Sequence, residues 1–330
     1  MFQSFRLLIA AGLASAILLV CSPAKAGSSE SPGDSLRQLD ERVLALGYRL
    51  AVAGRELCEA RQWHPGFAVH DLSQYAGSAR ENLATLGLLD GPGVLALVPG
   101  GPAAAAGLLR DDVLLAADGQ PLPRAPQGVE NSFAPTERII EALEQAFSDG
   151  HARLAVRRRG IDRQIDVPAA LGCATRFQVV PSTRLNAYAD GRYVQLTSAI
   201  AAFAADDDEL AALIAHELAH NILRHRVRLN EAGIDRGLLQ QFGRNARLTR
   251  ETEREADRFS VYLLARAGFD SRAAIRFWAR RAPPGALLFA GTHPRRRDRI
   301  AAVEAEAAEV ERLRRAGQDI RPVWTPAHLN

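Results

Sequence analysis

The sequence predicts an α+β protein in which a β-rich region precedes a mainly helical half that contains one small sheet. Residues 65–170 break into short apolar runs separated by glycine and proline, a pattern typical of strands and turns. From Asp208 onward, apolar residues recur at helical spacing in several long segments. With 330 residues, 47% of them hydrophobic and 24% charged, the chain can form about two or three folded units.

The first 26 residues have the composition of an export signal. Arg6 supplies the positive charge, Leu7 to Val20 form the apolar run, and Ala24-Lys25-Ala26 fits a cleavage site. An uncleaved membrane anchor is the alternative, but the run is shorter than the roughly 20 residues of a spanning helix. A lipoprotein would need a small residue before Cys21, where valine stands. We therefore expect residues 1–26 to be a signal peptide and the mature protein to be periplasmic or secreted.

The cysteines and the charge bear on the partners of the mature chain. Cys58 and Cys173 remain after cleavage, and in an exported protein such a pair predicts one disulfide, with two buried free thiols as the alternative. The formal charge of +3 does not indicate nucleic acid as a partner. No later stretch has the length and apolarity of a membrane-spanning segment, so none is expected in the mature chain.

Residues 27–64 predict a linker followed by an amphipathic helix. The helical pattern runs from Asp34 to about Arg61 and is expected to bend near Gly47 and Gly54. Residues 65–172 then predict a compact β-rich domain. Its expected elements are strands at 93–98 and 112–117, a helix at 136–147, and a hairpin formed by residues 152–158 and 163–167.

This β-rich region resembles bacterial PDZ domains of the protease-associated type. The resemblance is carried by Gly93-Val-Leu-Ala-Leu-Val-Pro-Gly-Gly-Pro-Ala-Ala-Ala-Ala-Gly-Leu108, followed by Asp112-Val-Leu-Leu-Ala-Ala-Asp-Gly-Gln-Pro121. It departs from such domains at Asp111-Asp112, where they have Gly-Asp. PDZ domains bind peptides by strand addition. The groove is expected between residues 86–89 and the 136–147 helix, with an internal structural clamp as the alternative to peptide binding.

The stretch from Asp206 to Arg226 carries the chemistry. Three aspartates offer a cap and favourable charge at a helix start, and a long helix is predicted from Asp208 to Leu229. His216 and His220 are four residues apart and therefore lie on one face, where two imidazoles can bind one metal ion. Glu217 can then act on a water molecule, which is the arrangement of a metal hydrolase.

A third metal ligand is needed for a catalytic zinc site. His225 lies nine residues after His216, half a helical circumference away, and is interpreted as a surface or packing histidine. Glu253 is the better candidate, because Asp257 shares its face and can hydrogen-bond the far nitrogen of a ligand histidine. A solvated face of Glu/Arg pairs is the alternative interpretation of this acidic helix.

Four motifs together resemble the HtpX-like, CAAX prenyl protease-type gluzincin metallopeptidases, and in particular their soluble periplasmic BepA-like branch. They are Asn186-Ala-Tyr-Ala189, His216-Glu-Leu-Ala-His220, Glu253-Arg-Glu-Ala-Asp257 and Thr292-His-Pro-Arg-Arg-Arg-Asp-Arg-Ile300. The resemblance implies one zinc ion bound by His216, His220 and Glu253. It also implies that His293 lies near the metal, where it either blocks the site or takes part in catalysis. A substrate-pairing edge strand is implied at Asn186, Ala187, Tyr188 and Ala189.

These observations predict a zinc metalloendopeptidase domain at residues 173–320, with a tail at 321–330, that cleaves exported or envelope polypeptides after capture by the PDZ-like domain. The alternative from another class is a catalytically silent adaptor or chaperone with a structural zinc site. Glu217, kept together with both histidines and the Glu/Asp pair, favours the enzyme. A third hypothesis is a self-inhibited protease in which the Cys58–Cys173 link holds the PDZ-like domain over the cleft.

Overall fold

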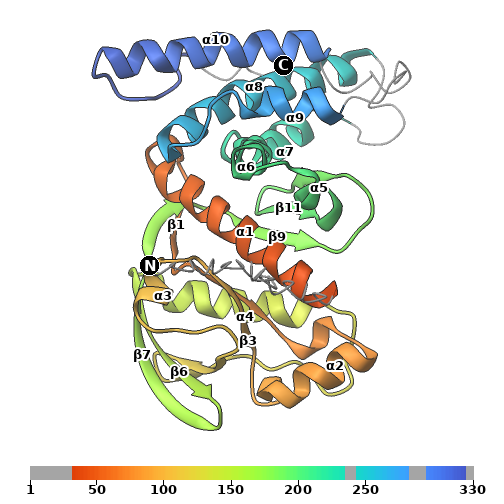
Figure 1. Cartoon of the computed structure of the whole chain (residues 1–330), viewed down its shortest axis with the longest axis vertical. Coiled ribbons are helices and arrows are strands. Elements are labelled where there is room, and N and C mark those ends of the chain that lie inside the picture. Colours follow the sequence, from red (N-terminus) through yellow and green to blue (C-terminus); the bar gives the residue numbers. More distant parts are fainter. Residues whose placement is uncertain (1–31, 235–242, 282–294, 325–330) are drawn as a thin grey trace, which may run out of the picture.

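The computed structural model describes residues 32–234, 243–281 and 295–324 (Figure 1). Its N-terminal half contains a six-stranded sheet in which every neighbouring pair is antiparallel. The path of strands is β2 (Phe67–His70), β3 (Gly93–Leu97), β4 (Val113–Ala117), β6 (His151–Arg158) and β7 (Ile161–Pro168), with β5 (Gln120–Pro121) beside β4. Within the described part of the chain, β2 is therefore an edge strand with a sheet partner on one side only.

Helix α4 (Ala134–Ala146) packs on this sheet through Ile139, Leu143 and the adjoining Phe147, which share a core with residues of β4 and β6. The strands, helix and hairpin expected in this region are thus confirmed. The shorter helices are η2 (Leu72–Gln74), α2 (Gly77–Leu83), η3 (Ala84–Leu88) and α3 (Pro102–Ala105).

The N-terminal amphipathic helix differs from the expectation. Helix α1 (Pro32–Ala53) continues through Gly47 without a break and ends at Gly54. Gly47 is needed for close packing, because a Cβ atom there would lie 2.5 Å from the ring of Phe177. Past a short turn, η1 (Arg55–Leu57), the chain forms β1 (Arg61–His64), which pairs with β8 (Ala170–Cys173). The predicted helix was therefore too long at its C-terminal end.

The disulfide between Cys58 and Cys173 lies beside this small β1–β8 sheet. The two Cα atoms are 5.6 Å apart, a normal spacing for a disulfide. The bond joins segments separated by 115 residues, so it links the end of α1 to the start of the C-terminal half. The pairing is the one that the cysteine count predicts.

The C-terminal half combines a small sheet with helices. Its strand order is β10 (Ala187–Ala189), β11 (Tyr193–Thr197), β9 (Arg176–Val180), with β10 antiparallel and β9 parallel to β11. The helices are α5 (Ser198–Phe203), α6 (Asp207–Ile222), α7 (His225–Glu231), α8 (Gly243–Ala267), α9 (Ala273–Arg281) and α10 (Arg296–Arg315). Among the described residues, β10 and β9 are the two edge strands of this small sheet.

Helix α6 is largely buried in the core of this half. Asp206 caps its start by accepting the Glu209 amide, and Leu210, Ile214 and Leu218 are fully buried. Figure 1 shows α1 running between the helical half and the six-stranded sheet. Its buried residues Val43, Leu46 and Leu50 belong to the same core as α6 and α8. Helix α1 therefore joins the two halves.

The helix predicted from 208 to 229 is interrupted. Arg224 adopts the left-handed backbone conformation with φ 53°, which ends α6 and starts α7 in a new direction. Across the described segments, no helix combines the length and hydrophobicity needed to cross a bilayer. The residues expected to be a signal peptide, 1–26, lie outside those segments.

Candidate metal centre

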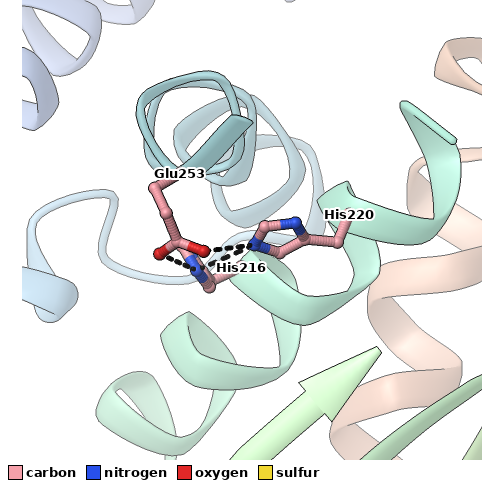
Figure 2. A group of neighbouring side chains, drawn as sticks. All are labelled: His216, His220 and Glu253. Carbon is pink, nitrogen blue, oxygen red and sulfur yellow. Dashed lines mark hydrogen bonds and ion pairs between the residues drawn. The ribbon is translucent and has the colours of Figure 1, made fainter. Parts of the chain in front are cut away.

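Three predicted ligands converge at the contact between α6 and α8. Figure 2 shows the Nε2 atoms of His216 and His220 facing the carboxylate of Glu253. The two Nε2 atoms are 3.2 Å apart. The Glu253 oxygens lie 3.6 Å from the first and 3.5 Å from the second. One helix supplies both imidazoles because residues four apart share a face, and the second helix supplies the carboxylate.

The spacing of these donor atoms fits a zinc ion. Zinc bonds to histidine nitrogen and carboxylate oxygen at about 2.0–2.2 Å, so neighbouring ligands of a tetrahedral site lie about 3.3 Å apart. The observed separations of 3.2, 3.5 and 3.6 Å bracket that value. Within the described segments, this is the cluster of histidine, cysteine and carboxylate side chains that could hold a metal ion.

An arginine-anchored carboxylate supports His216 from behind. Asp257, which is fully buried, has its Oδ1 atom 3.0 Å from Nδ1 of His216. Arg299 of α10 donates two hydrogen bonds to Asp257, of 2.7 and 2.6 Å, and its guanidinium stacks on Trp278 at 4.1 Å. Asp257 thus occupies the position predicted for it, while the contribution of Arg299 was missed.

The carboxylates give this cluster a strong affinity for positive charge. Burial alone would lower the pKa of His216, but hydrogen bonds with Asp257 and Glu253 raise it to about 10. Burial lowers the pKa of His220 well below its usual range, against the opposing attraction of Glu253. Burial and the two carboxylates thus favour a protonated His216 beside a neutral His220. This is expected where Glu253 and Asp257 surround a position for one cation.

His225 is a buried residue behind the candidate ligands, which contradicts a surface position and agrees with a packing role. Its side chain is 2% exposed, and its Nδ1 atom is 2.8 Å from Nδ1 of His220. Its Nε2 atom is 3.0 Å from Glu255. The prediction of half a circumference assumed one straight helix, whereas the left-handed turn at Arg224 brings His225 back over α6. His225 contacts the candidate ligand His220 and does not belong to the candidate cluster itself.

A cleft of about 100 Å³ opens beside the ligands and contains the expected base. Glu217 lines it together with His216 and Glu253, and so do Ala187 and Trp278. Glu217 follows His216 directly on α6 and lines the cleft beside the candidate ligands. The cleft is therefore bounded by the candidate metal ligands on one side and by the β10 segment on another.

Among the residues that the structure describes, no strand pairs with the outer edge of β10. The Asp190 amide donates a hydrogen bond to the Tyr193 carbonyl, and the Thr197 amide donates one to the Asn186 carbonyl. Antiparallel pairs alternate between bonded and non-bonded positions. The backbone N–H and C=O groups of Ala187 and Ala189 therefore point to the outer edge, while the backbone groups of Tyr188 point to β11. Asn186 itself precedes the strand and lines the cleft.

Two other outcomes concern predicted residues. His293 lies outside the described residues. Arg299 lies in the Thr292–Ile300 motif, and its side chain is only 15% exposed. No sequence signal links His225 to Glu255, because neither glycine nor proline marks the turn at Arg224.

A larger cavity of about 570 Å³ lies between the two halves. Its walls come from β2, α4, α1 and β9, with Phe67, Ile140, Phe177 and Asp40 among the lining residues. The groove expected at residues 86–89 is therefore misplaced. That segment forms η3, it does not line the cavity, and the free edge beside α4 belongs to β2 instead.

Comparison with known families supports both halves of this description. Residues 155–307 match the sequence profile of Peptidase family M48, and residues 93–140 match that of the PDZ domain. The first match includes the three candidate ligands, Glu217, Asp257 and Arg299. The second covers β3, α3, β4, β5 and the start of α4.

Two curated proteins are similar to parts of the chain. A protein of Vibrio cholerae named as a beta-barrel assembly-enhancing protease is 32% identical over 161 residues, covering 38% of this chain and 33% of the relative. The mitochondrial metalloendopeptidase OMA1 of Schizosaccharomyces pombe is 33% identical over 141 residues, covering 36% of this chain and 42% of the relative. The chain thus matches less than half the length of each relative.

Proposed function

Because the chain carries a peptidase family M48 domain joined to a PDZ domain, we propose that it is a zinc-dependent metalloendopeptidase. The observation that carries the proposal is the convergence of His216, His220 and Glu253 at zinc-ligand spacing, with Glu217 lining the adjoining cleft. Two imidazoles and one carboxylate leave one position of a tetrahedral zinc ion for water or substrate, as catalytic sites require.

The chemistry divides between the ion and the side chains around it. A zinc ion bound by these ligands supplies Lewis acidity, which polarises the scissile carbonyl and favours deprotonation of the attacking water. The Glu217 carboxylate accepts that proton and returns it to the leaving amine. Glu253 closes the ligand set, and Asp257 keeps the ring of His216 in orientation.

The substrates in this proposal are extended polypeptides. The cleft lies beside the free edge of β10, where a peptide backbone can pair with the outward groups of Ala187 and Ala189. We place the capture of a second peptide segment in the cavity beside β2 and α4, because PDZ domains bind peptides between an edge strand and a helix. The cavity lining is mostly apolar, so the captured segment is apolar too.

The cellular setting is inferred from the N-terminal signal pattern and the disulfide. Both point to an exported protein, periplasmic or secreted. One relative is named for beta-barrel assembly, so proteins of the cell envelope are the substrates we propose.

The test of catalysis is metal analysis combined with cleavage of a quenched peptide library by wild type and Glu217→Gln. Both proteins should bind one zinc ion per chain. Loss of the general base should reduce kcat/KM by about 10²- to 10⁴-fold. Glu231→Gln, at an exposed position at the end of α7, serves as the matched control and should leave kcat/KM unchanged. A zinc-loaded wild type that cleaves no better than Glu217→Gln would refute the enzyme and favour the adaptor.

The test of peptide capture uses the inactive Glu217→Gln protein, so that bound peptide is not cleaved. Ile140→Asn places a polar group on the α4 wall of the cavity and should weaken the binding of a labelled apolar peptide by about tenfold or more. Gln145→Asn, at an exposed position on the same helix, is the control. Equal affinities measured by fluorescence anisotropy for Ile140→Asn and its control would remove the cavity as the capture site.

A further inference from the structure

The ligand His220 is backed by a buried chain of side chains that includes no metal ligand. Its Nδ1 atom lies 2.8 Å from Nδ1 of His225, and the two rings meet edge to face at 78°. Nε2 of His225 lies 3.0 Å from Glu255 Oε2. Arg228 completes the chain with contacts of 2.7 and 3.3 Å to the two Glu255 oxygens.

The chain allows one consistent placement of protons. His220 presents Nε2 to Glu253 and His216, so a metal ion there requires the lone pair of that nitrogen. Its proton then resides on Nδ1 and is donated to His225. His225 must accept at Nδ1 and therefore carries its own proton on Nε2, which it donates to Glu255. An anionic carboxylate held by Arg228 is the acceptor that this order requires.

We propose that His225, fixed by Glu255 and Arg228, is a positioning residue that selects the tautomer and ring orientation in which His220 binds zinc. The proposal rests on the zinc site of the proposed function and assigns a role to residues outside it. Ligand histidines commonly donate their other ring N–H to a carboxylate or carbonyl. Here the acceptor is the imidazole of His225. Its own orientation is fixed by the Glu255 carboxylate, which lies farther from the metal position.

The fold explains how three distant residues form this chain. Arg224 ends α6 in the left-handed conformation, and His225 starts α7 directly after it. Arg228 follows on the same helix, while Glu255 comes from α8, two residues after the ligand Glu253. His225 is 2% exposed and Glu255 8%, so water competes little for these bonds. The two ligand histidines are therefore supported in parallel, His216 by Asp257–Arg299 and His220 by His225–Glu255–Arg228.

The first test measures zinc affinity by competition with a chromophoric chelator, without any peptide. His225→Phe keeps a ring but removes both hydrogen bonds, and Glu255→Gln keeps the shape but removes the charge. Each should weaken zinc binding by about 10- to 100-fold. Because both act through one chain, the double variant should lose less than the product of the two single effects. The Co²⁺-substituted variants should also show a shifted visible absorption band.

Glu251→Gln is the control, because Glu251 lies on α8 as well but pairs with Arg247 at the surface. It should bind zinc as the wild type does. Zinc affinities of His225→Phe and Glu255→Gln within about threefold of wild type would overturn the proposal, and so would an equal loss in Glu251→Gln. A purely structural role would lower the melting temperature of the zinc-free variants and leave the zinc affinity of the folded protein intact.

The second test uses the wild-type protein and is independent of whether the variants fold. Nitrogen-15 chemical shifts of the zinc-loaded protein should show the Nε2–H tautomer for His225 and the Nδ1–H tautomer for His220. A proton on Nδ1 of His225 would contradict the proposal. Neither test measures peptide cleavage, so a protein that binds zinc in this way but cleaves nothing would refute the proposed function and leave this inference standing.

Discussion

At the scale of the residue, the candidate centre is defined by how buried charges are matched. Asp257 is fully buried between His216 and Arg299, and an unpaired carboxylate in that position would be strongly unfavourable. The bidentate contact with Arg299 satisfies both oxygens, and the stacking on Trp278 fixes the guanidinium plane. Arg299 therefore stabilises the folded site through Asp257.

Removing Arg299 should destabilise the protein more than an ordinary surface substitution does. Arg299→Gln removes the bidentate partner of the buried Asp257 carboxylate and leaves it only the His216 imidazole, and breaking a buried ion pair typically costs about 3–5 kcal/mol in the free energy of unfolding. Adding Asp257→Asn should recover part of that loss, since the buried charge then disappears. Arg297→Gln, at an exposed position on α10, should have no effect. Urea unfolding of the zinc-free proteins gives the comparison, and a change below about 0.5 kcal/mol in Arg299→Gln would contradict it.

At the scale of the element, short segments position the chemistry. Helix α6 places both histidines on one face, and the left-handed turn after it redirects His225. The strand β10 has three residues, and its free edge lies where the cleft opens. A short edge strand of this kind has little tendency to aggregate but still offers backbone groups to a substrate.

A proline at the free edge should weaken substrate binding and leave the metal site intact. Ala187→Pro removes an outward N–H, while the bonds of Asn186 and Tyr188 to β11 remain. We expect kcat/KM for peptides to fall about tenfold, the effect of losing one hydrogen bond, with unchanged zinc affinity. Ala187→Val keeps the N–H and is the control for a change of side chain. If both variants cleave at the same rate, substrate does not pair with this edge.

At the scale of the whole molecule, α1 and the disulfide hold the two halves around the large cavity. Asp40 of α1 lines that cavity and accepts a hydrogen bond from the Val179 amide of β9. Burial raises the pKa of this carboxyl to about 7, because the carboxylate is poorly hydrated between the halves. Arg37 lies near it but contacts Asp111, so the attraction of that arginine only partly offsets the effect of burial.

The stability of the assembled halves should therefore depend on the charge of Asp40. Its folded pKa lies above the unfolded value of 3.8, so its contribution to stability is present below about pH 4 and is lost as the pH rises through about 7. Asp40→Asn is neutral throughout and keeps an acceptor for Val179. Relative to wild type, it should be about 1–3 kcal/mol more stable at pH 8 and equally stable near pH 4, measured by urea unfolding.

The exposed Asp149→Asn is the matched control for this pH dependence and should show no such difference between the two pH values. If Asp40→Asn is no more stable than wild type at pH 8, the Asp40 carboxylate is as well hydrated in the cavity as in the unfolded chain, and the prediction is wrong.

The sequence by itself determined most of the elements and the candidate ligands. Helical periodicity and the four-residue spacing of His216 and His220 are local properties, and local geometry brings those two residues to one face. Glu253 meets them only because α8 packs against α6. Only the tertiary structure decided what surrounds them. His225 faces His220 because the backbone turns at Arg224 without glycine or proline to announce it. The partners of Asp257 and the walls of the cavity come from elements far apart in the chain, whose contacts depend on packing and not on any local pattern.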